Sequence, residues 1–229
     1  MSGKVYFSPE ILTYLSDLKE NNSRDWFQAN KSRYEEHVKQ PFLEFIGDFA
    51  TRLGSISKHI RADPRPNGGS LFRIYRDVRF SKNKDPYKTH AAAQFRHEMG
   101  KDVHAPGFYF HIQPGTILAG SGIWHPDSKT LRKIREGIDE QQDRWISIKE
   151  DKKFKSLMKF EGESLKRNPQ GFDINHPLIE DLKRKDFMTV AYFEEADIFG
   201  EGFMDQFVNF CEVASPFMKF IADAAELPY

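Results

Sequence analysis

Apolar residues recur at helical spacing over the first 54 residues. Ser8-Pro9 is a favourable helix start, and an apolar stripe follows it as far as Asn21. Ser23 can cap a second helix. Pro41 would interrupt that helix and open a third, because proline is tolerated in a first helical turn and disrupts a helix interior. The pattern predicts three N-terminal helices.

Between residues 56 and 124 the pattern changes to short runs of β-branched and aromatic residues separated by turn signals. Short turns between successive strands favour an antiparallel sheet. Gly120, Ser121 and Gly122 are expected to form a bulge that breaks the last strand. The predicted strands cover residues 71–80, 91–97, 107–113 and 116–124.

Helical spacing returns after Asp127. The segment 149–159 reads as a charged surface helix, and 187–194 as one possible strand. The last helix, 201–227, is expected to divide near Pro216. The order of elements predicts an α+β fold in which a central, mostly antiparallel sheet is flanked by N-terminal and C-terminal helices. We expect a single domain over 1–229, helical in 1–54, β-rich in 56–124 and mainly helical in 127–229.

Composition narrows the class of protein. Hydrophobic residues make up 39% of the chain and aromatic residues 14%, which is typical of a globular protein and argues against disorder. The single cysteine, Cys211, excludes a disulfide within the chain. No apolar run approaches the length of a membrane span, and the N-terminus lacks the features of a signal peptide. These features predict a cytoplasmic protein without a membrane partner.

Positive charge is concentrated in the stretch 71–90, although the whole chain has a formal charge of zero. Six cationic side chains stand there against Asp77 and Asp85, which leaves a net charge of +4. Such a local excess suits an anionic ligand. The cations are Arg73, Arg76, Arg79, Lys82, Lys84 and Lys88.

If residues 71–80 form a strand, Arg73 and Arg79 share one face with Asp77 between them. Guanidinium forks bind carboxylate and phosphate groups well, and Asp77 would hold them in place. Arg76 falls on the opposite, otherwise apolar face, where a charge needs a partner. Two further interpretations stay open: an internal ion-pair network, and contact with nucleic acid.

Further candidate ligand-binding residues follow the arginines. Lys82, Lys88 and His90 could close over an anion that the arginines orient. Trp124 could serve as a stacking platform for a ligand or could lie in the core. Asp77 and His111 are the candidates for proton transfer, the arginines being expected to lower the pKa of His111. A half-buried structural histidine is the alternative for His111.

The histidines do not form a recognisable metal motif. Five of them recur between residues 90 and 125, but their spacing fits no compact metal site. We therefore predict no metal site, and the sequence identifies no cofactor. The five are His90, His97, His104, His111 and His125.

Several runs resemble, in the same order, a family of bacterial and fungal proteins known as a domain of unknown function. The most specific is FRIYRDVRFSKNKDPYKTH, in which the family signature reads FRIYRDVRFSKxKxPYKTH. LKENNSRDWFQANKSRY, GFYFHIQPG, GSGIWHPD and GFDINHPLIEDLKRKDF extend the resemblance over nearly the whole chain. The resemblance implies a cytosolic, single-domain protein. It assigns no activity, cofactor or catalytic residue.

The residues therefore predict a protein that binds, or acts on, a small phosphate- or carboxylate-bearing ligand at the basic stretch. The alternative is a nucleic-acid or protein interaction module without catalysis. The zero net charge, together with nine Asp and Glu against one Lys in 186–229, counts against extended binding of nucleic acid. Whether the protein is an enzyme, and its oligomeric state, are not determined by the sequence.

Overall fold

The computed structural model describes residues 3–100 and 105–229. Its six-stranded sheet has the order β1-β2-β3-β4-β6-β5, and every neighbouring pair is antiparallel. This arrangement confirms the predicted α+β fold with a central antiparallel sheet. The strands are β1 (Ile60–Arg61), β2 (Ala91–His97), β3 (Gly107–Gln113), β4 (Thr116–Ile123), β5 (Lys159–Glu161) and β6 (Phe187–Phe193).

Helices precede and follow the β-rich centre, as predicted. The N-terminal elements are α1 (Glu10–Glu20), α2 (Arg24–Ala29), α3 (Lys31–Tyr34), the π-helical η1 (Glu35–Lys39) and α4 (Gln40–Leu53). The later ones are α5 (Ser128–Glu140), α6 (Gln142–Glu150), α7 (Lys152–Leu157), α8 (Ile179–Leu182), α9 (Glu195–Ile198) and α10 (Phe203–Ala224).

The N-terminal helices depart from the prediction at Pro41. The helical path is not interrupted before Pro41, because the π-helical turn η1 leads directly from α3 into α4. Pro41 lies in the first turn of α4 and has no N–H group, so it cannot donate a regular i→i−4 hydrogen bond at this point. The wider π-helical turn accommodates the missing hydrogen bond. The expected N-cap at Ser23 is confirmed, since its side chain accepts a hydrogen bond from the Trp26 amide.

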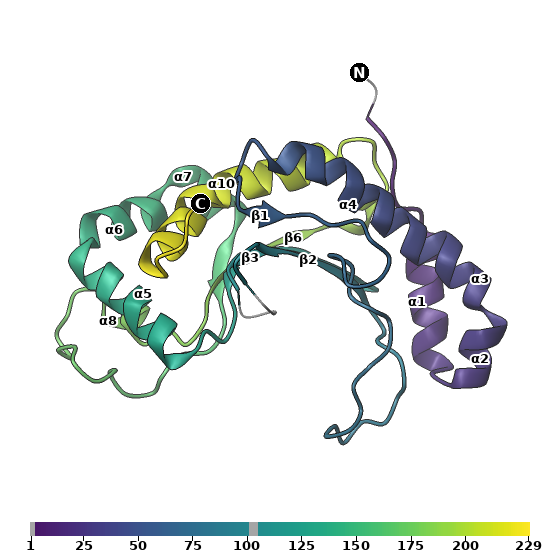
Figure 1. Cartoon of the computed structure of the whole chain (residues 1–229), viewed down its shortest axis with the longest axis horizontal. Helices are drawn as coiled ribbons and strands as arrows, with labels where there is room; N and C mark the ends of the chain where they lie inside the picture. The colour runs from purple at the N-terminus through teal and green to yellow at the C-terminus, as the bar shows by residue number, and fades with distance from the viewer. Residues whose placement is uncertain (1–2, 101–104) are drawn as a thin grey trace.

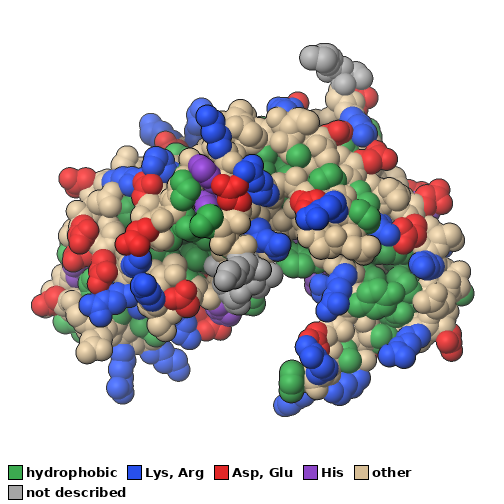
Figure 2. All heavy atoms as spheres, in the orientation of Figure 1, with side chains coloured by type: hydrophobic (Ala, Val, Ile, Leu, Met, Phe, Trp, Pro, Cys, Tyr) green, Lys and Arg blue, Asp and Glu red, His purple; other side chains and the backbone are tan. Residues whose placement is uncertain are grey.

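The sheet has a helix-covered face and an open face. On the first, Phe95 and Phe110 pack against Phe49 of α4 and Phe207 of α10. Phe49 and Phe207 also contact each other, at 5.0 Å between ring centroids. Figure 1 shows α4 and α10 lying together on one side of the sheet. The other side faces a notch in the surface (Figure 2).

Two predicted interruptions are absent. β4 is one continuous strand, and its register with β3 runs without a bulge from Gln113↔Thr116 to Gly107↔Gly122. α10 likewise passes through Pro216 without dividing. Packing explains the second difference, because the side chains around Pro216 are buried in the core and hold the helix together despite one missing hydrogen bond.

The sheet also contains two strands that the pattern did not indicate as separate elements. β1 is only two residues long. β5 replaces the end of the predicted helix 149–159, because Lys159, Phe160 and Glu161 pair with β6. The predicted strand at 187–194 is confirmed as β6, and it lies between β4 and β5.

The largest correction concerns residues 71–80, which do not form a strand. Only isolated bridges occur in the segment, Leu71↔Ala93 and Tyr75↔Tyr87. Residues 71–90 instead form an irregular, doubled-back projection, here called the basic arm, which extends from the sheet on the side away from α4 and α10 (Figure 1). Residues 71–80 contact the returning half of the arm on one side, but the structure describes no strand beside them on the other side. Their strand propensity is therefore not realised.

Some expectations fall outside this description. The polar loop predicted between the second and third strands includes residues 101–104, and His104 is one of them. These residues lie outside the described part of the chain. Within the described residues, none of the helices has both the length and the apolar character needed to cross a bilayer.

Candidate functional site

A cavity of about 580 Å³ lies on the open face of the sheet. This volume is within the range of small-molecule binding sites. Its wall combines side chains from the base of the basic arm with others from five strands or their ends. We call it the sheet cavity. Its polar and aromatic lining residues include Phe72, Lys88, His90, Gln94, Tyr109, Trp124 and Glu161.

Glycines form the floor of the sheet cavity. Gly107 and Gly122 pair across β3 and β4, and a Cβ atom on either would collide with a neighbouring backbone carbonyl. Gly122 also has a φ of +118°, which other residues rarely adopt. Gly120 differs, because the nearest atom to an added Cβ would be the Tyr109 Cβ at 3.5 Å, an ordinary contact. A larger residue at Gly120 would therefore reduce the cavity without straining the backbone.

Lys88 provides the positive charge at the arm end of the cavity. Its ammonium donates a hydrogen bond to the Arg73 carbonyl at 3.1 Å and lies 5.1 Å from the centre of the Phe72 ring. Burial, and then the nearby charge of Arg73, lower the pKa of Lys88. Among the described residues no carboxylate forms an ion pair with Lys88. A half-buried cation in this position is suited to bind an anion.

The opposite end of the cavity carries a carboxylate whose partners are present. Glu161 accepts a hydrogen bond from the Tyr192 hydroxyl at 3.0 Å and lies 3.3 Å from the Lys159 ammonium. Its negative charge is therefore offset locally. The cavity is polarised, with a cation at the arm end that pairs with no described carboxylate and a paired carboxylate at the β5 end.

His90 and His111 stack on each other with ring centroids 4.7 Å apart. Burial lowers the pKa of both, and His111, Lys88 and Arg76 help to bring the pKa of His90 to about 4. Both rings are therefore neutral at pH 7 and can accept a proton or a hydrogen bond. The lowered pKa of His111 agrees with the prediction in direction, but its cause is burial and not the arginines. The Tyr109 hydroxyl lies 2.9 Å from Nδ1 of His111.

The predicted arginine site is not assembled as expected. Among the described residues Asp77 forms an ion pair with Arg79 and no other, through a 2.7 Å contact between Oδ2 and Nη2, and the bonds to Arg79 lower the pKa of Asp77 to about 2. Arg73 and Arg76 are exposed and form no ion pair with another described residue. The expectation of a buried Arg76 is therefore wrong, because it depended on a strand with an apolar face. The cavity lining includes Lys88, His90 and Trp124 of the predicted residues, and does not include Arg73, Arg76, Arg79, Lys82, Asp77 or His111.

A buried carboxylate that the sequence analysis did not select supports the mouth of the cavity. Asp186 is only 1% exposed. Its Oδ1 accepts a hydrogen bond from the backbone amide of His125 and also lies 2.8 Å from Nδ1 of the His125 ring. Its Oδ2 accepts from the Glu163 amide. His125 has a left-handed backbone, with φ of 46°, and stacks on Trp124 at 4.2 Å. Asp186 thus fixes the corner that positions Trp124.

Other lining residues escaped sequence analysis for identifiable reasons. Glu161 lies just past the predicted surface helix 149–159, where β5 was not recognised, and Gln94 and Tyr109 are common polar side chains within strands. Alternation along 91–97 and 107–113 does place Gln94 and Tyr109 on one face of the sheet, where they are cross-strand partners. In the described part of the chain, three or more His, Cys, Asp or Glu side chains do not gather as a possible metal site.

Comparison with known proteins gives a family and no individual relative. A search of curated proteins and a search of solved structures each found no match. A family model described as a conserved hypothetical protein, DUF2461, matches residues 10–220. The match covers nearly the whole chain and includes every strand, the basic arm and all described residues of the sheet cavity. The chain therefore belongs to the family of conserved hypothetical proteins DUF2461.

Proposed function

We propose that the protein binds a small anionic ligand with a planar body, such as a nucleotide, in the sheet cavity. The observation that carries this proposal is the Lys88 ammonium, which is half-buried at one end of the cavity and has no carboxylate partner among the described residues. Burying an unpaired charge costs free energy. A bound phosphate or carboxylate would offset that cost.

The remaining lining supports a planar ligand body. Phe72, Tyr109 and Trp124 offer aromatic surface, while Gln94 and the neutral His90 offer hydrogen-bonding groups of fixed position. The missing side chain at Gly120 leaves room for a ring between these walls, since the nearest atom to an added Cβ there is the Tyr109 Cβ at 3.5 Å. A ligand would place its anionic group near Lys88 and its uncharged end toward Glu161, since Lys88 supplies the positive charge while the carboxylate at the other end is already paired with Lys159.

A thermal-shift screen tests the proposal with nucleotides, sugar phosphates and polycarboxylates at two salt concentrations. A ligand at a hundred times its dissociation constant stabilises the fold by about 2.7 kcal/mol, which raises the melting temperature by roughly 5–11 °C in a chain of this length, at about 2–4 °C per kcal/mol. A pocket ligand should keep most of this shift at the higher salt concentration, because a half-buried pair is screened less than an exposed one.

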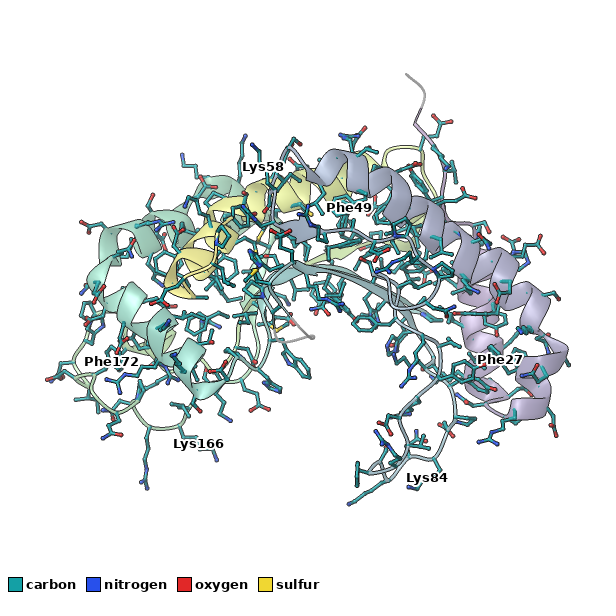
Figure 3. The ribbon with its side chains drawn as sticks, viewed as in Figure 1. Phe27, Phe49, Lys58, Lys84, Lys166 and Phe172 are labelled. Carbon is teal, nitrogen blue, oxygen red and sulfur yellow. The ribbon has the colours of Figure 1, made fainter. Side chains whose placement is uncertain are left out.

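Lys88→Met removes the charge and keeps an apolar stem over Phe72. We expect it to weaken binding about 10- to 100-fold, because a charge-assisted hydrogen bond contributes about 1.5–3 kcal/mol. Titration calorimetry measures the change. Lys58→Gln is the matched control, since Lys58 is exposed on the opposite side of the molecule (Figure 3). Equal affinity in wild type and Lys88→Met would contradict the proposal.

A further inference from the structure

We infer that the ligand is one unit of a single-stranded nucleic acid, whose neighbouring nucleotides run along the basic arm. The inference rests on the proposed function, since one base occupies the sheet cavity. It adds a second contact surface, outside the cavity, made of exposed guanidinium, ammonium and aromatic groups. Figure 2 shows lysine and arginine side chains along the arm where it borders the notch.

The arm presents cations whose charge is not used within the fold. Arg73 and Arg76 are exposed and have no ion-pair partner among the described residues, and the same holds for Lys82. Asp205 and Asp223 of α10 pair elsewhere, with Arg52 and Arg144 respectively. Within the described residues, an internal ion pair accounts for Arg79, through its neighbour Asp77, and for no other cation of the arm.

Aromatic side chains alternate with these cations. Phe80 is 95% exposed near the tip of the arm, where the Arg79 guanidinium lies 5.9 Å from its ring centre. Tyr75 is 50% exposed between Arg73 and Arg76. Exposed aromatic rings beside cations are the combination that binds single strands, because bases stack on the rings while the cations bind the phosphates.

The arm and the cavity form one continuous surface. Phe72, Lys88 and His90 belong to the base of the arm and also line the cavity. Arg73 lies close enough to lower the pKa of Lys88, and Arg76 close enough to lower that of His90. A phosphate held at Lys88 would therefore be followed by cations at Arg73 and Arg76. Lys84 and Lys166 stand on opposite sides of the notch (Figure 3), so a chain leaving the cavity meets positive charge on both sides.

These features favour a single strand over a duplex or an acidic peptide. A paired base cannot enter the cavity, and the few unpaired cations match a short run of phosphates. An acidic peptide would pair with the guanidinium groups, but its carboxylates would gain nothing from stacking on Phe80 or Tyr75. DNA and RNA share the recognised chemistry, and both are included in the test.

Fluorescence anisotropy with pyrimidine oligonucleotides of one to twelve nucleotides, as DNA and as RNA, tests the inference. Affinity should rise with length over the first four to six nucleotides and then level off. Three phosphate contacts predict a slope of about −2 for log affinity against log salt, since each contact on a single strand contributes roughly 0.7. Duplexes of equal length should bind more weakly.

Variants of the arm assign the contacts. Arg76→Gln should reduce the steepness of the salt slope by about 0.7. Phe80→Ser should weaken oligonucleotide binding roughly tenfold, in line with the loss of one stacked base, and Phe80→Tyr should retain wild-type affinity. Both residues are exposed, so the fold should tolerate the changes. Lys58→Gln, which removes a cation far from the sheet cavity and the basic arm, should leave the length dependence of the affinity and its salt slope unchanged.

The outcomes separate this inference from the proposed function. Binding of a mononucleotide that weakens in Lys88→Met but does not tighten with oligonucleotide length would overturn the single strand and retain the cavity ligand. Oligonucleotide binding that is indifferent to Lys88→Met would overturn the cavity and, with it, this inference. Equal binding of duplex, or competition by polyglutamate together with no effect of Phe80→Ser, would identify the arm as a general polyanion or acidic-peptide surface.

Discussion

The two faces of the sheet use the same strands in opposite ways. The helix-covered face carries large aromatic and aliphatic side chains, such as Phe95 and Phe110, packed against α4 and α10. The open face carries glycine, glutamine, tyrosine and histidine around a cavity of about 580 Å³. Alternation along each strand separates these roles residue by residue. Core packing on the helix-covered face therefore supplies most of the stability of the sheet, and the open face can contain a cavity.

Adjacent residues of β4 offer the sharpest test of this division. Ile117 is 2% exposed, while its neighbour Leu118 lines the cavity. Ile117→Ala should lower the free energy of unfolding by about 2–5 kcal/mol, because it opens a hole in a packed core. Leu118→Ala should cost about 1 kcal/mol, since its side chain is only partly buried. Chemical denaturation measures both, and similar losses would show that the open face is as tightly packed as the other.

Acid should destabilise the protein through the open face. The folded pKa of His90 is about 4, below its ordinary value of 6.5, so the unfolded chain binds the proton more readily. The free energy of unfolding is therefore unaffected by the titration of this histidine above pH 6.5. It decreases as the pH falls from 6.5 to about 4, because the unfolded chain takes up the proton first. The loss should be between about 1 and 3 kcal/mol, since His90 is half-buried.

Denaturation curves recorded between pH 7 and pH 4 measure this effect. His90→Gln should flatten the dependence in that range, and the difference between variant and wild type removes the contribution of the carboxylates that titrate nearby. His111, whose pKa is also lowered by burial, should give a further decrease of the same sign. A His90→Gln curve parallel to that of wild type would show that His90 is solvated.

Asp186→Asn should weaken the corner that holds Trp124. The buried carboxylate accepts hydrogen bonds from two backbone amides, of which an asparagine side chain can satisfy only one with its single oxygen. We expect a loss of about 1–3 kcal/mol in the free energy of unfolding. Iodide quenching should also increase, because Trp124 would become more exposed while Trp26 on α2 and Trp145 in the core keep their surroundings. Unchanged quenching would show that Asp186 does not position Trp124.

The smallest expected effect on stability comes from filling the cavity. Gly120→Val should change the free energy of unfolding by less than about 1 kcal/mol, because the new Cβ makes only ordinary contacts and valine favours a strand. It should nevertheless abolish the thermal shift caused by a cavity ligand. Gly122→Val is the contrasting control, since its backbone conformation and a clash with the Phe187 carbonyl forbid a side chain. Ligand binding unaffected by Gly120→Val would place the site elsewhere.

The sequence alone was sufficient to predict those elements whose hydrogen bonding and packing are local or strictly periodic. The strands Ala91–His97 and Gly107–Gln113 were predicted with their observed bounds. The antiparallel sheet follows from short connections between successive strands. The return of helical structure after Asp127 was also predicted, and the structure adds that the Asp127 side chain caps α5 by accepting hydrogen bonds from amides of its first turn. Three members of the cavity lining, Lys88, His90 and Trp124, were already candidates.

Tertiary structure decided the features that depend on distant partners. Residues 71–80 have strand composition but lack a neighbouring strand, so they form the basic arm. Lys159–Glu161 became a strand only because β6 offers a free edge, and α10 continues through Pro216 because its surroundings are packed. The cavity itself could not be foreseen, since it arises where cross-strand register aligns Gly120 with Tyr109 and brings His90 against His111. Local sequence determines propensity, whereas only the assembled fold determines which partner satisfies it.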